Sequence, residues 1–455
     1  MGLPGTSNGP LPACLQLDSA MELQHAEDAN TPEAHGGARI GERTARSLVA
    51  LALLCCIALA LRETTASAIA KWNTPEALRL AERLDPSNPE IPVKLAQALA
   101  AQSGGGDPSR IAAAFLQAVR LAPERAGNWA SLGDALDVAG QETEARQAYE
   151  RALDLYPRSP AINWQFANFL VREGDIHDAE EPFQRAIEGD ASMRMPAFDL
   201  AWRAGMPSAA ILRIVPPTQD DRAAYLDYLT ASQRLDAAAQ VWNDLLASPK
   251  PFSMDSAFRY FDALLASHRI DELEAMWASM AGRDPKPFQW QPQGADRIIN
   301  GGFDAPLLGG GFGWRTVPVD GANVTLDSSV FHDATPSLSI HFDAQHNLDF
   351  GNVVQYAAVK PNTKYEFAAY TRTDGITTDS GPRIAVYDPL DRAALWAETP
   401  NLLGTNSWNE QEVHFRTGPR TRIVVVQVVR IPSTKFDNLI GGTLWIDDVT
   451  LKASP

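Results

Sequence analysis

Apolar side chains between residues 128 and 157 recur every three or four positions, the period of an amphipathic helix. The stretch divides at Gly140 into two such halves, so each half is predicted to carry one apolar face. Gly133 is among the small residues where two neighbouring helices must approach closely. Pro157 ends the second half, because proline cannot donate the next helical hydrogen bond and clashes with the preceding turn. This pattern predicts a helix pair that is too short to bury its own apolar face and therefore needs neighbours.

The pattern returns 34 residues later and, with a glycine-rich insertion at 103–107, also upstream over 89–125. The later copies of Leu132, Gly133, Leu136, Ala145, Tyr149 and Ala152 are Phe166, Ala167, Leu170, Ala179, Phe183 and Ala186. With Trp129 before these positions and Pro157 after them, the spacing over 126–159 resembles the tetratricopeptide repeat. The resemblance implies an α-solenoid of helix pairs. We expect five or six pairs across residues 71–283, with atypical repeats towards the ends.

In tetratricopeptide folds the first helix of each pair lines a groove that binds a protein partner. Carried over by the repeat spacing, the groove positions here are Val93, Gln97, Ala130, Asp134, Asp137, Trp164, Asn168 and Arg172. The lining is mixed and mildly acidic, and only Arg172 could clamp a peptide carboxylate. The alternatives are that the groove binds nothing or packs against the chain's own C-terminal domain.

An uncharged run of 15 residues, 47–61, follows a tail (1–46) that we predict to be disordered from its composition. A spanning helix wants about 20 apolar residues, and the mild stretch 64–70 can extend this one. We favour a single-pass transmembrane or signal-anchor segment over residues 47–68, with Arg39, Arg43 and Arg46 in the cytoplasm. The alternatives are a secretory signal cleaved after Ala68 and a buried soluble helix. An anchor would place the protein in a bacterial inner membrane with its C-terminal domains in the periplasm.

The period changes beyond a Pro- and Gln-rich linker at 284–298. Apolar and polar residues then alternate in short runs separated by turn signals, which predicts an antiparallel β-sandwich over residues 299–455. The fold class is therefore a helical solenoid followed by a sandwich, behind one N-terminal membrane helix. No cysteine follows Cys56, so neither folded domain can contain a disulfide.

The sandwich opens with Asn-Gly-Gly-Phe-Asp at 300–304 and closes with Trp-Ile-Asp-Asp-Val at 445–449. This pairing resembles the jelly-roll carbohydrate-binding modules of bacterial xylanases and glucanases. The resemblance implies a polysaccharide ligand, for which the candidates off the core face are Tyr370, Arg372, Tyr387, Trp396 and Arg430.

The resemblance also implies a structural calcium ion held by Asn300, Asp304 and Asp447, hard oxygen ligands that suit this ion. By the two-residue period Asp447 shares a face with Trp445, Val449 and Leu451, so its carboxylate needs a partner. The alternative to calcium is that Asp447 only accepts backbone hydrogen bonds from the N-terminal strand.

The net charge of −17 argues against nucleic acid as a partner, because phosphate binding depends on clustered Lys and Arg. Phosphate-binding loops, zinc-protease and serine-hydrolase motifs are absent, so we do not expect an enzyme. The leading hypothesis is a non-catalytic, membrane-anchored envelope adaptor that binds a protein through its repeats and a polysaccharide through its sandwich, during assembly or export of surface glycans. The alternatives are a pure protein scaffold and an accessory subunit of a polysaccharide-processing enzyme.

Overall fold

The computed structural model describes residues 37–251, 253–283, 295–333 and 336–454. Most of the predicted disordered tail and of the predicted linker lies outside these residues. The chain forms two compact units, Met1–Ala98 and Leu99–Pro455, and the division falls inside helix α3. Each unit is described by itself.

The first unit contains a long apolar helix and the start of the repeats. Its helices are α1 (Gly37–Ala70), α2 (Pro75–Leu84) and most of α3 (Glu90–Ala100). Residues 44–70 of α1 are apolar and long enough to cross a membrane, and the leucines between 48 and 61 are exposed. The last turns of α1 differ, because Ala66 and Ala70 are buried and α1 packs against α2.

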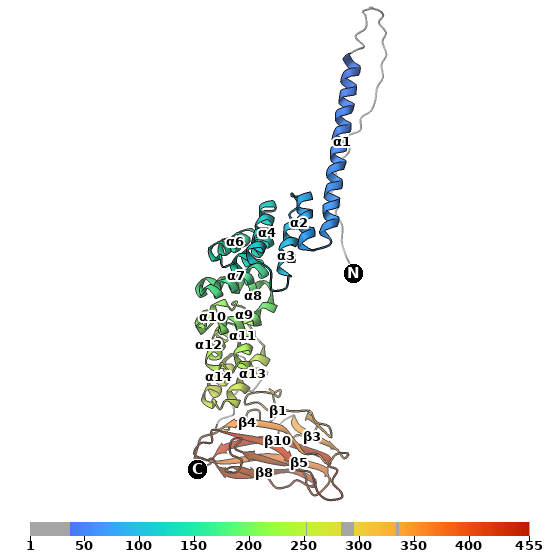
Figure 1. Cartoon of the computed structure of the whole chain (residues 1–455). Helices are drawn as coiled ribbons and strands as arrows, with labels where there is room; N and C mark the ends of the chain where they lie inside the picture. The colour runs from blue at the N-terminus through green and yellow to red at the C-terminus, as the bar shows by residue number, and fades with distance from the viewer. Residues whose placement is uncertain (1–36, 252, 284–294, 334–335, 455) are drawn as a thin grey trace, which may run out of the picture. The chain divides into compact units, whose positions relative to one another are not determined.

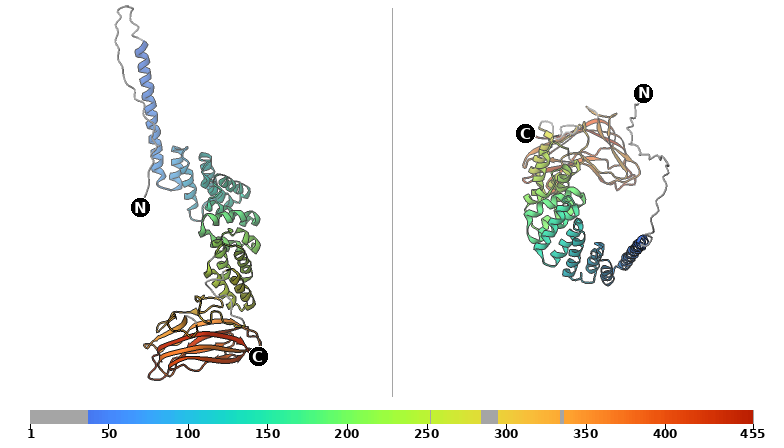
Figure 2. Two further views of the ribbon diagram at one scale, coloured as in Figure 1. Left: turned by 180° about the vertical axis from the view of Figure 1, so that it is seen from behind. Right: turned by 90° about the horizontal axis from the view of Figure 1, so that it is seen from above.

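The helical part of the second unit consists of stacked helix pairs (Figure 1, Figure 2). Its helices are α4 (Pro108–Leu121), α5 (Ala126–Val138), α6 (Glu142–Leu155), α7 (Pro160–Glu173), α8 (Ile176–Gly189), the 3-10 helix η1 (Ala191–Met193), α9 (Arg194–Arg203), α10 (Ser208–Ile214), α11 (Gln219–Ala231), α12 (Leu235–Ala247), α13 (Met254–Ala266) and α14 (Ile270–Arg283).

Local sequence explains where these helices begin and how closely they pack. Ser159 caps α7 by accepting a hydrogen bond from the backbone N–H of Ile162, and Pro160 follows at the first helical position. Within the pair α5–α6, Gly133 lies against the ring of Tyr149, and a Cβ built at Gly133 would come within 2.9 Å of that ring. The small residue that the repeat pattern places here is therefore required by the approach of the two helices.

The sandwich consists of two five-stranded antiparallel sheets, with strand orders β1-β4-β9-β6-β7 and β2-β3-β10-β5-β8. The strands are β1 (Arg315–Thr316), β2 (Ala322–Asp327), β3 (Ser337–Asp343), β4 (Phe350–Ala358), β5 (Lys364–Ile376), β6 (Arg383–Tyr387), β7 (Trp396–Glu398), β8 (Gly404–Arg416), β9 (Ile423–Arg430) and β10 (Gly441–Ala453). Side chains such as Phe342, Phe367 and Val426 fill the core between the sheets. The predicted order of helical repeats followed by an antiparallel sandwich is confirmed.

A loop of the sandwich joins it to the last two helices. A Cβ built at Gly311 would lie 2.3 Å from the ring of Trp277, so only glycine fits there. The ring of Phe312 meets the same indole edge-on at 5.6 Å between ring centroids. Arg315 forms two hydrogen bonds with the carboxylate of Asp262, at 2.6 and 3.1 Å. Solenoid and sandwich therefore share one buried apolar cluster.

Candidate functional site

The groove positions predicted on α5 and α7 lie together on the first-helix side of the repeats. Asp134 accepts hydrogen bonds from the hydroxyl of Tyr149 and, at 2.8 Å, from the amide of Gln165. Burial raises the pKa of the Asp134 carboxyl, while the hydrogen bond from Tyr149 opposes that rise. The surface around half-buried Asp134 is therefore polar, and the carboxylate already accepts hydrogen bonds from neighbouring side chains.

The other predicted groove residues mostly bond to one another. Arg172 forms an ion pair with Asp137 on the preceding repeat, so its charge is already matched and the predicted clamp for a peptide carboxylate is not free. The amide of Asn168 donates to the backbone oxygen of Trp164 at 2.7 Å, and the Trp164 ring packs edge-on against Phe183. Gln97 is exposed on α3 in the first unit.

A hollow in the sandwich runs along β9 beside the end of β7. It measures about 470 Å³ and is lined mainly by Trp396, Arg392, Gln427, Asn352 and Asp349. Aromatic, amide and charged groups thus converge on one open depression, the combination that sugar binding requires. We call it the Trp396 groove.

Trp396 is held in this groove by an aromatic and cationic stack. Its ring lies parallel to Tyr387 at 5.0 Å, and the guanidinium of Arg392 lies 4.2 Å from the centroid of the Tyr387 ring. The Tyr387 hydroxyl donates to the side-chain oxygen of Gln427 at 2.9 Å and accepts from Arg392 at the same distance. Tyr387 itself is buried, which raises the pKa of its phenol, whereas Trp396 is 43% exposed. Tyr387 therefore supports the ring, and Trp396 is the platform that a ligand can reach.

Arg430, another predicted glycan residue, has a fully buried side chain. Its guanidinium donates to the backbone oxygens of Ser380, Leu348 and Asn438 and to the side-chain oxygen of Asn347. It therefore connects three loops at one end of the sandwich, and it also lines the Trp396 groove.

Tyr370 and Arg372 lie on the opposite sheet, so the structure does not bring them together with Tyr387 and Trp396. The imidazole of His332 stacks on Tyr370 at 3.7 Å and covers one face of the phenol. Arg372 lies over the ring of Trp445, at 5.7 Å from its centroid.

The closing strand β10 departs from the simple alternation expected for it. A bulge between Asp447 and Thr450, with Asp448 at φ 47°, moves the strand by one residue. Leu444 and Ile446 fill the core before the bulge and Val449 and Leu451 after it. Trp445 is therefore on the outer face, where its indole donates to Asp327 at 2.9 Å. The prediction that it shares the core face with Val449 and Leu451 was wrong because the bulge reverses the alternation.

The three residues predicted to hold calcium have different environments in the structure. The side chain of Asn300 exchanges two hydrogen bonds with the backbone of Ala305. Asp447 accepts the backbone N–H groups of His332 and Asp448, both at 2.9 Å. The carboxylate that links the N-terminal segment of the sandwich to β10 is Asp296 and not Asp447. Asp296 accepts hydrogen bonds from the backbone N–H groups of Ile298 in its own segment and Leu451 in β10.

Asp304 is exposed beside a hollow of about 310 Å³ that Asp333 and Asp448 also line. Partial burial raises the pKa of the Asp304 carboxyl, and the charges of Asp448 and Asp333 add to the rise. Among the residues that the structure describes, no group of three His, Cys, Asp or Glu side chains is placed to hold a metal ion.

Comparison with known proteins adds likenesses of fold. No family model and no curated protein matches the chain. A solved structure of MamA is 17% identical, covering 34% of this chain and 87% of that one with a TM-score of 0.30. YrrB, titled a TPR protein with an unusual peptide-binding site, is 16% identical over 47% of this chain and 95% of its own, with a TM-score of 0.25. A structure titled "CBM4 structure and function" is 16% identical over 34% and 99%, with a TM-score of 0.26. The solved structures similar to this chain thus include both tetratricopeptide repeat proteins and carbohydrate-binding modules.

Proposed function

We propose that this protein is a non-catalytic, membrane-anchored adaptor of the bacterial envelope, in which the repeats hold a protein partner and the sandwich binds a polysaccharide. The observation that carries the proposal is the Trp396 groove. An exposed indole lies on a buried Tyr387, with Arg392 and the amides of Gln427 and Asn352 beside it. A sugar ring can stack on Trp396 while these polar groups bind its hydroxyls.

The anchor is supported by the two ends of α1. Its exposed leucines have no protein partner among the described residues, as expected of a segment that faces lipid. The last turns of α1 contact the folded domain, because Ala66 is completely buried, Ala70 is buried and α1 packs on α2. Cleavage after Ala68 would separate this helix from its partner, which favours an uncleaved anchor over a removable signal. The mature N-terminal mass tests this choice: a chain beginning at Ile69 contradicts the anchor.

Protein binding by the first-helix side is supported by its composition. The surface combines Trp164, partly exposed, with hydrogen-bonding groups from two successive first helices. Surfaces that mix an aromatic ring with oriented polar groups suit protein recognition. Because the Asp137–Arg172 pair is internally matched, we expect affinity there to come from side-chain packing more than from net charge.

The glycan claim is tested with the full chain in zwitterionic nanodiscs, by affinity electrophoresis through gels containing xylan, a soluble β-glucan or a uronate-rich polysaccharide. We expect retardation by at least one gel and a loss of at least tenfold in affinity for Trp396→Ala. Trp408→Ala is the matched control, because Trp408 is a half-exposed indole on the other sheet. Loss with Trp408→Ala but not with Trp396→Ala would move the site to the other sheet, equal loss in both would contradict the Trp396 groove, and no retardation at all would leave the pure scaffold as the better reading.

Calcium is a separate proposal about the hollow near Asp304, where neighbouring carboxylates repel one another. A bound divalent cation would relieve that repulsion and raise the melting temperature of the sandwich. The measurement is thermal unfolding of the full chain with millimolar Ca²⁺ and with EGTA. Equal midpoints remove the metal from the proposal.

A further inference from the structure

The second helices of the repeats form a row in which one member is short. Helices α6, α8 and α14 have 14 residues and α12 has 13, whereas α10 has only 7. The cause is in the sequence: Val215 precedes Pro216, and a residue before proline is driven out of the helical region. Val215 is indeed extended, with φ −76° and ψ 119°. The row therefore lacks about two turns of helix at α10.

A hollow of about 920 Å³ lies over this short helix and extends across α8, from α6 on one side to α12 on the other. A helix about 10 Å across that rises 1.5 Å per residue occupies roughly 120 Å³ per residue, so the hollow has the volume of about eight residues. α10 is shorter than α8 by seven residues. The hollow thus includes the place of the missing turns and has room for a short helix, and we call it the second-helix groove.

The floor of the second-helix groove is apolar. Ala209 and Pro217 are exposed and Leu212 is half-buried, all from α10 or the segment after it. An apolar floor that reaches solvent is a place where an aliphatic side chain gains free energy by burial.

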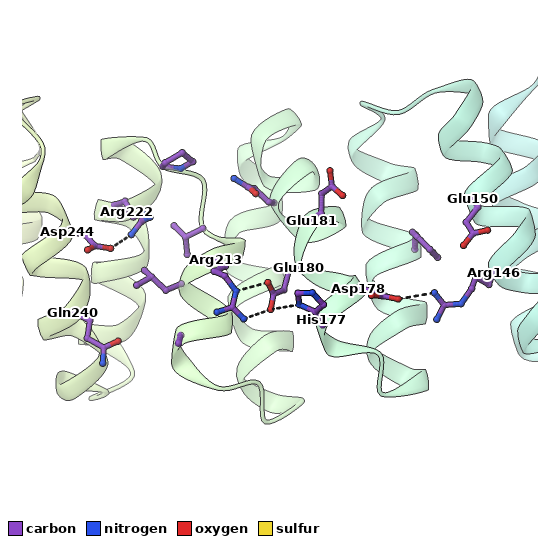
Figure 3. A pocket seen from close by; sticks show the side chains of 16 residues that line it. Arg146, Glu150, His177, Asp178, Glu180, Glu181, Arg213, Arg222, Gln240 and Asp244 are labelled. Atoms are coloured by element: carbon purple, nitrogen blue, oxygen red, sulfur yellow. Dashed lines mark hydrogen bonds and ion pairs between the residues drawn. The ribbon is translucent and has the colours of Figure 1, made fainter.

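The rim of the groove carries an excess of negative charge. Figure 3 shows Arg213 facing Glu180, with the Arg222–Asp244 pair on one side and the Arg146–Asp178 pair on the other. Arg213 holds Glu180 through two hydrogen bonds, at 2.6 and 2.7 Å, which lowers the pKa of that carboxyl. Arg213 and Arg222 are thereby each matched by one carboxylate of the rim, and Arg146 pairs with Asp175 as well as with Asp178.

Two further carboxylates line the same rim, Glu150 and Glu181. Glu150 is exposed, and in the described part of the chain it has no cationic side chain within ion-pair distance. Glu181 is 70% exposed and paired only with Arg185 on its own helix. Five carboxylates against three guanidinium groups leave a surface that attracts positive charge.

We propose that the second-helix groove docks a short amphipathic helix of a partner protein, which completes the row of second helices. Leucine-sized side chains of the partner pack on Leu212 and Pro217, and its Lys or Arg side chains meet Glu150 and Glu181. This surface is distinct from the first-helix side and from the Trp396 groove, so the protein can hold two protein segments at once.

The test uses synthetic peptides as probes. The first probe, called the lysine peptide, is a fluorescent, end-capped 14-residue helical peptide with leucines at helical spacing and lysines on both flanks. A second peptide replaces each lysine by glutamate, and a third replaces each leucine by serine. Fluorescence anisotropy is measured with the full chain in zwitterionic nanodiscs, with empty nanodiscs as the blank. We expect saturable binding of the lysine peptide and at least tenfold weaker binding of each of the other two.

Variants locate the binding. Glu150→Lys and Glu181→Lys should each weaken the lysine peptide at least fivefold, and Leu212→Asp should abolish its binding. The matched control is Glu188→Lys, an exposed carboxylate on α8 outside the groove, which should leave binding unchanged. Asp137→Ala on the first-helix side should also leave it unchanged. The proposal is overturned if the lysine and glutamate peptides bind equally, if no peptide saturates, or if Glu188→Lys weakens binding as much as Glu181→Lys.

Discussion

Polar side chains bond to partners at different sequence separations in the repeats and in the sandwich. In the repeats, ion pairs join one helix to the equivalent helix of the next repeat. The pairs Asp137–Arg172, Glu180–Arg213 and Asp227–Arg259 span 35, 33 and 32 residues. Most of these groups remain partly exposed. One repeat length therefore separates nearly all of these partners.

In the sandwich, buried polar groups bind backbone atoms from remote segments. Asp447 and His332 are 115 residues apart, and Asp296 and Leu451 are 155 apart. Unlike the repeat pairs, Asp447 and Asp296 are buried. Losing an exposed ion pair costs little, whereas leaving a buried acceptor without its donor costs its desolvation. The repeats should thus tolerate loss of polar contacts that the sandwich does not.

Arg430→Met should have the largest effect. It leaves three backbone oxygens and one amide oxygen at the loop end of the sandwich without their donor, so we expect the free energy of unfolding of the sandwich to fall by about 3–5 kcal/mol. Urea unfolding followed by tryptophan fluorescence measures it. The control is Arg416→Met on the exposed end of β8, expected within about 0.5 kcal/mol of the parent. Similar losses in both would contradict the buried role.

Gly133→Ala should be the next largest effect, and it concerns packing within a repeat. The new methyl group would meet the Tyr149 ring at 2.9 Å, so α5 and α6 must move apart, at a cost of about 2–3 kcal/mol. Gly127→Ala, in the same helix but with nothing within 4 Å of the added atom, should instead stabilise slightly through helix propensity. Circular dichroism at 222 nm during urea unfolding compares the two. Effects of the same sign would refute the proposed close approach.

Asp447→Asn should change how stability depends on pH. Burial raises the pKa of Asp447 to about 6, above its ordinary value of 3.8, and hydrogen bonds from the His332 and Asp448 N–H groups oppose the rise. The stability that this difference contributes is present below about pH 4 and is lost as the pH rises through 6, because folding must then hold a buried charge. Asparagine cannot ionise.

The parent should therefore lose about 1–2 kcal/mol relative to Asp447→Asn between pH 4 and pH 7. Denaturation of both proteins at each pH gives the difference, because contributions that the two proteins share cancel on subtraction. A difference that stays constant over this range would show that Asp447 does not titrate there.

Arg259→Gln should have the smallest effect. Arg259 makes a two-point contact with Asp227 of the preceding pair, at 2.7 and 3.0 Å, but its side chain is 55% exposed. We expect a loss of less than about 1 kcal/mol at low salt, smaller again in 1 M NaCl because the charges are screened. Calorimetry at the two salt concentrations measures it. A loss as large as that of Arg430→Met would remove the contrast between the two regions.

The same contrast explains how far the sequence could predict the structure. The repeat spacing identified Gly133 as a point of close approach between two helices, because a helix pair repeats its contacts at a fixed interval, but the ring that it meets, Tyr149, came from the structure. The short α10 also had a signal, Val215 before Pro216 and Pro217, but the pattern predicts only where a helix stops and not that a groove results. The predicted groove residues Asp137 and Arg172 do lie together, yet their pairing depends on side-chain directions.

The sandwich was predictable in class and not in detail. Alternation correctly placed Phe367 in the core. It failed at Trp445, because the bulge after Asp447 reverses the alternation between Trp445 and Val449, and bulges have no fixed sequence signature. Arg430 is the last residue of β9, after a run that is apolar on both faces. Nothing in the neighbouring sequence shows that three loops converge on its guanidinium. Trp396 and Tyr387 were named individually, but their stacking required the fold.

The loop containing Gly311, which packs against Trp277, has a consequence for how the sandwich could be exchanged by recombination during evolution. A Pro-rich linker such as the one before the sandwich is a natural boundary at which recombination could replace the following domain. Here a substitute sandwich would also need a glycine at the position of Gly311 and a ring at that of Phe312, or the last helix pair would be left with an uncovered indole. Successful recombination should therefore carry α13 and α14 along with the sandwich, and the natural unit of exchange begins inside the repeats.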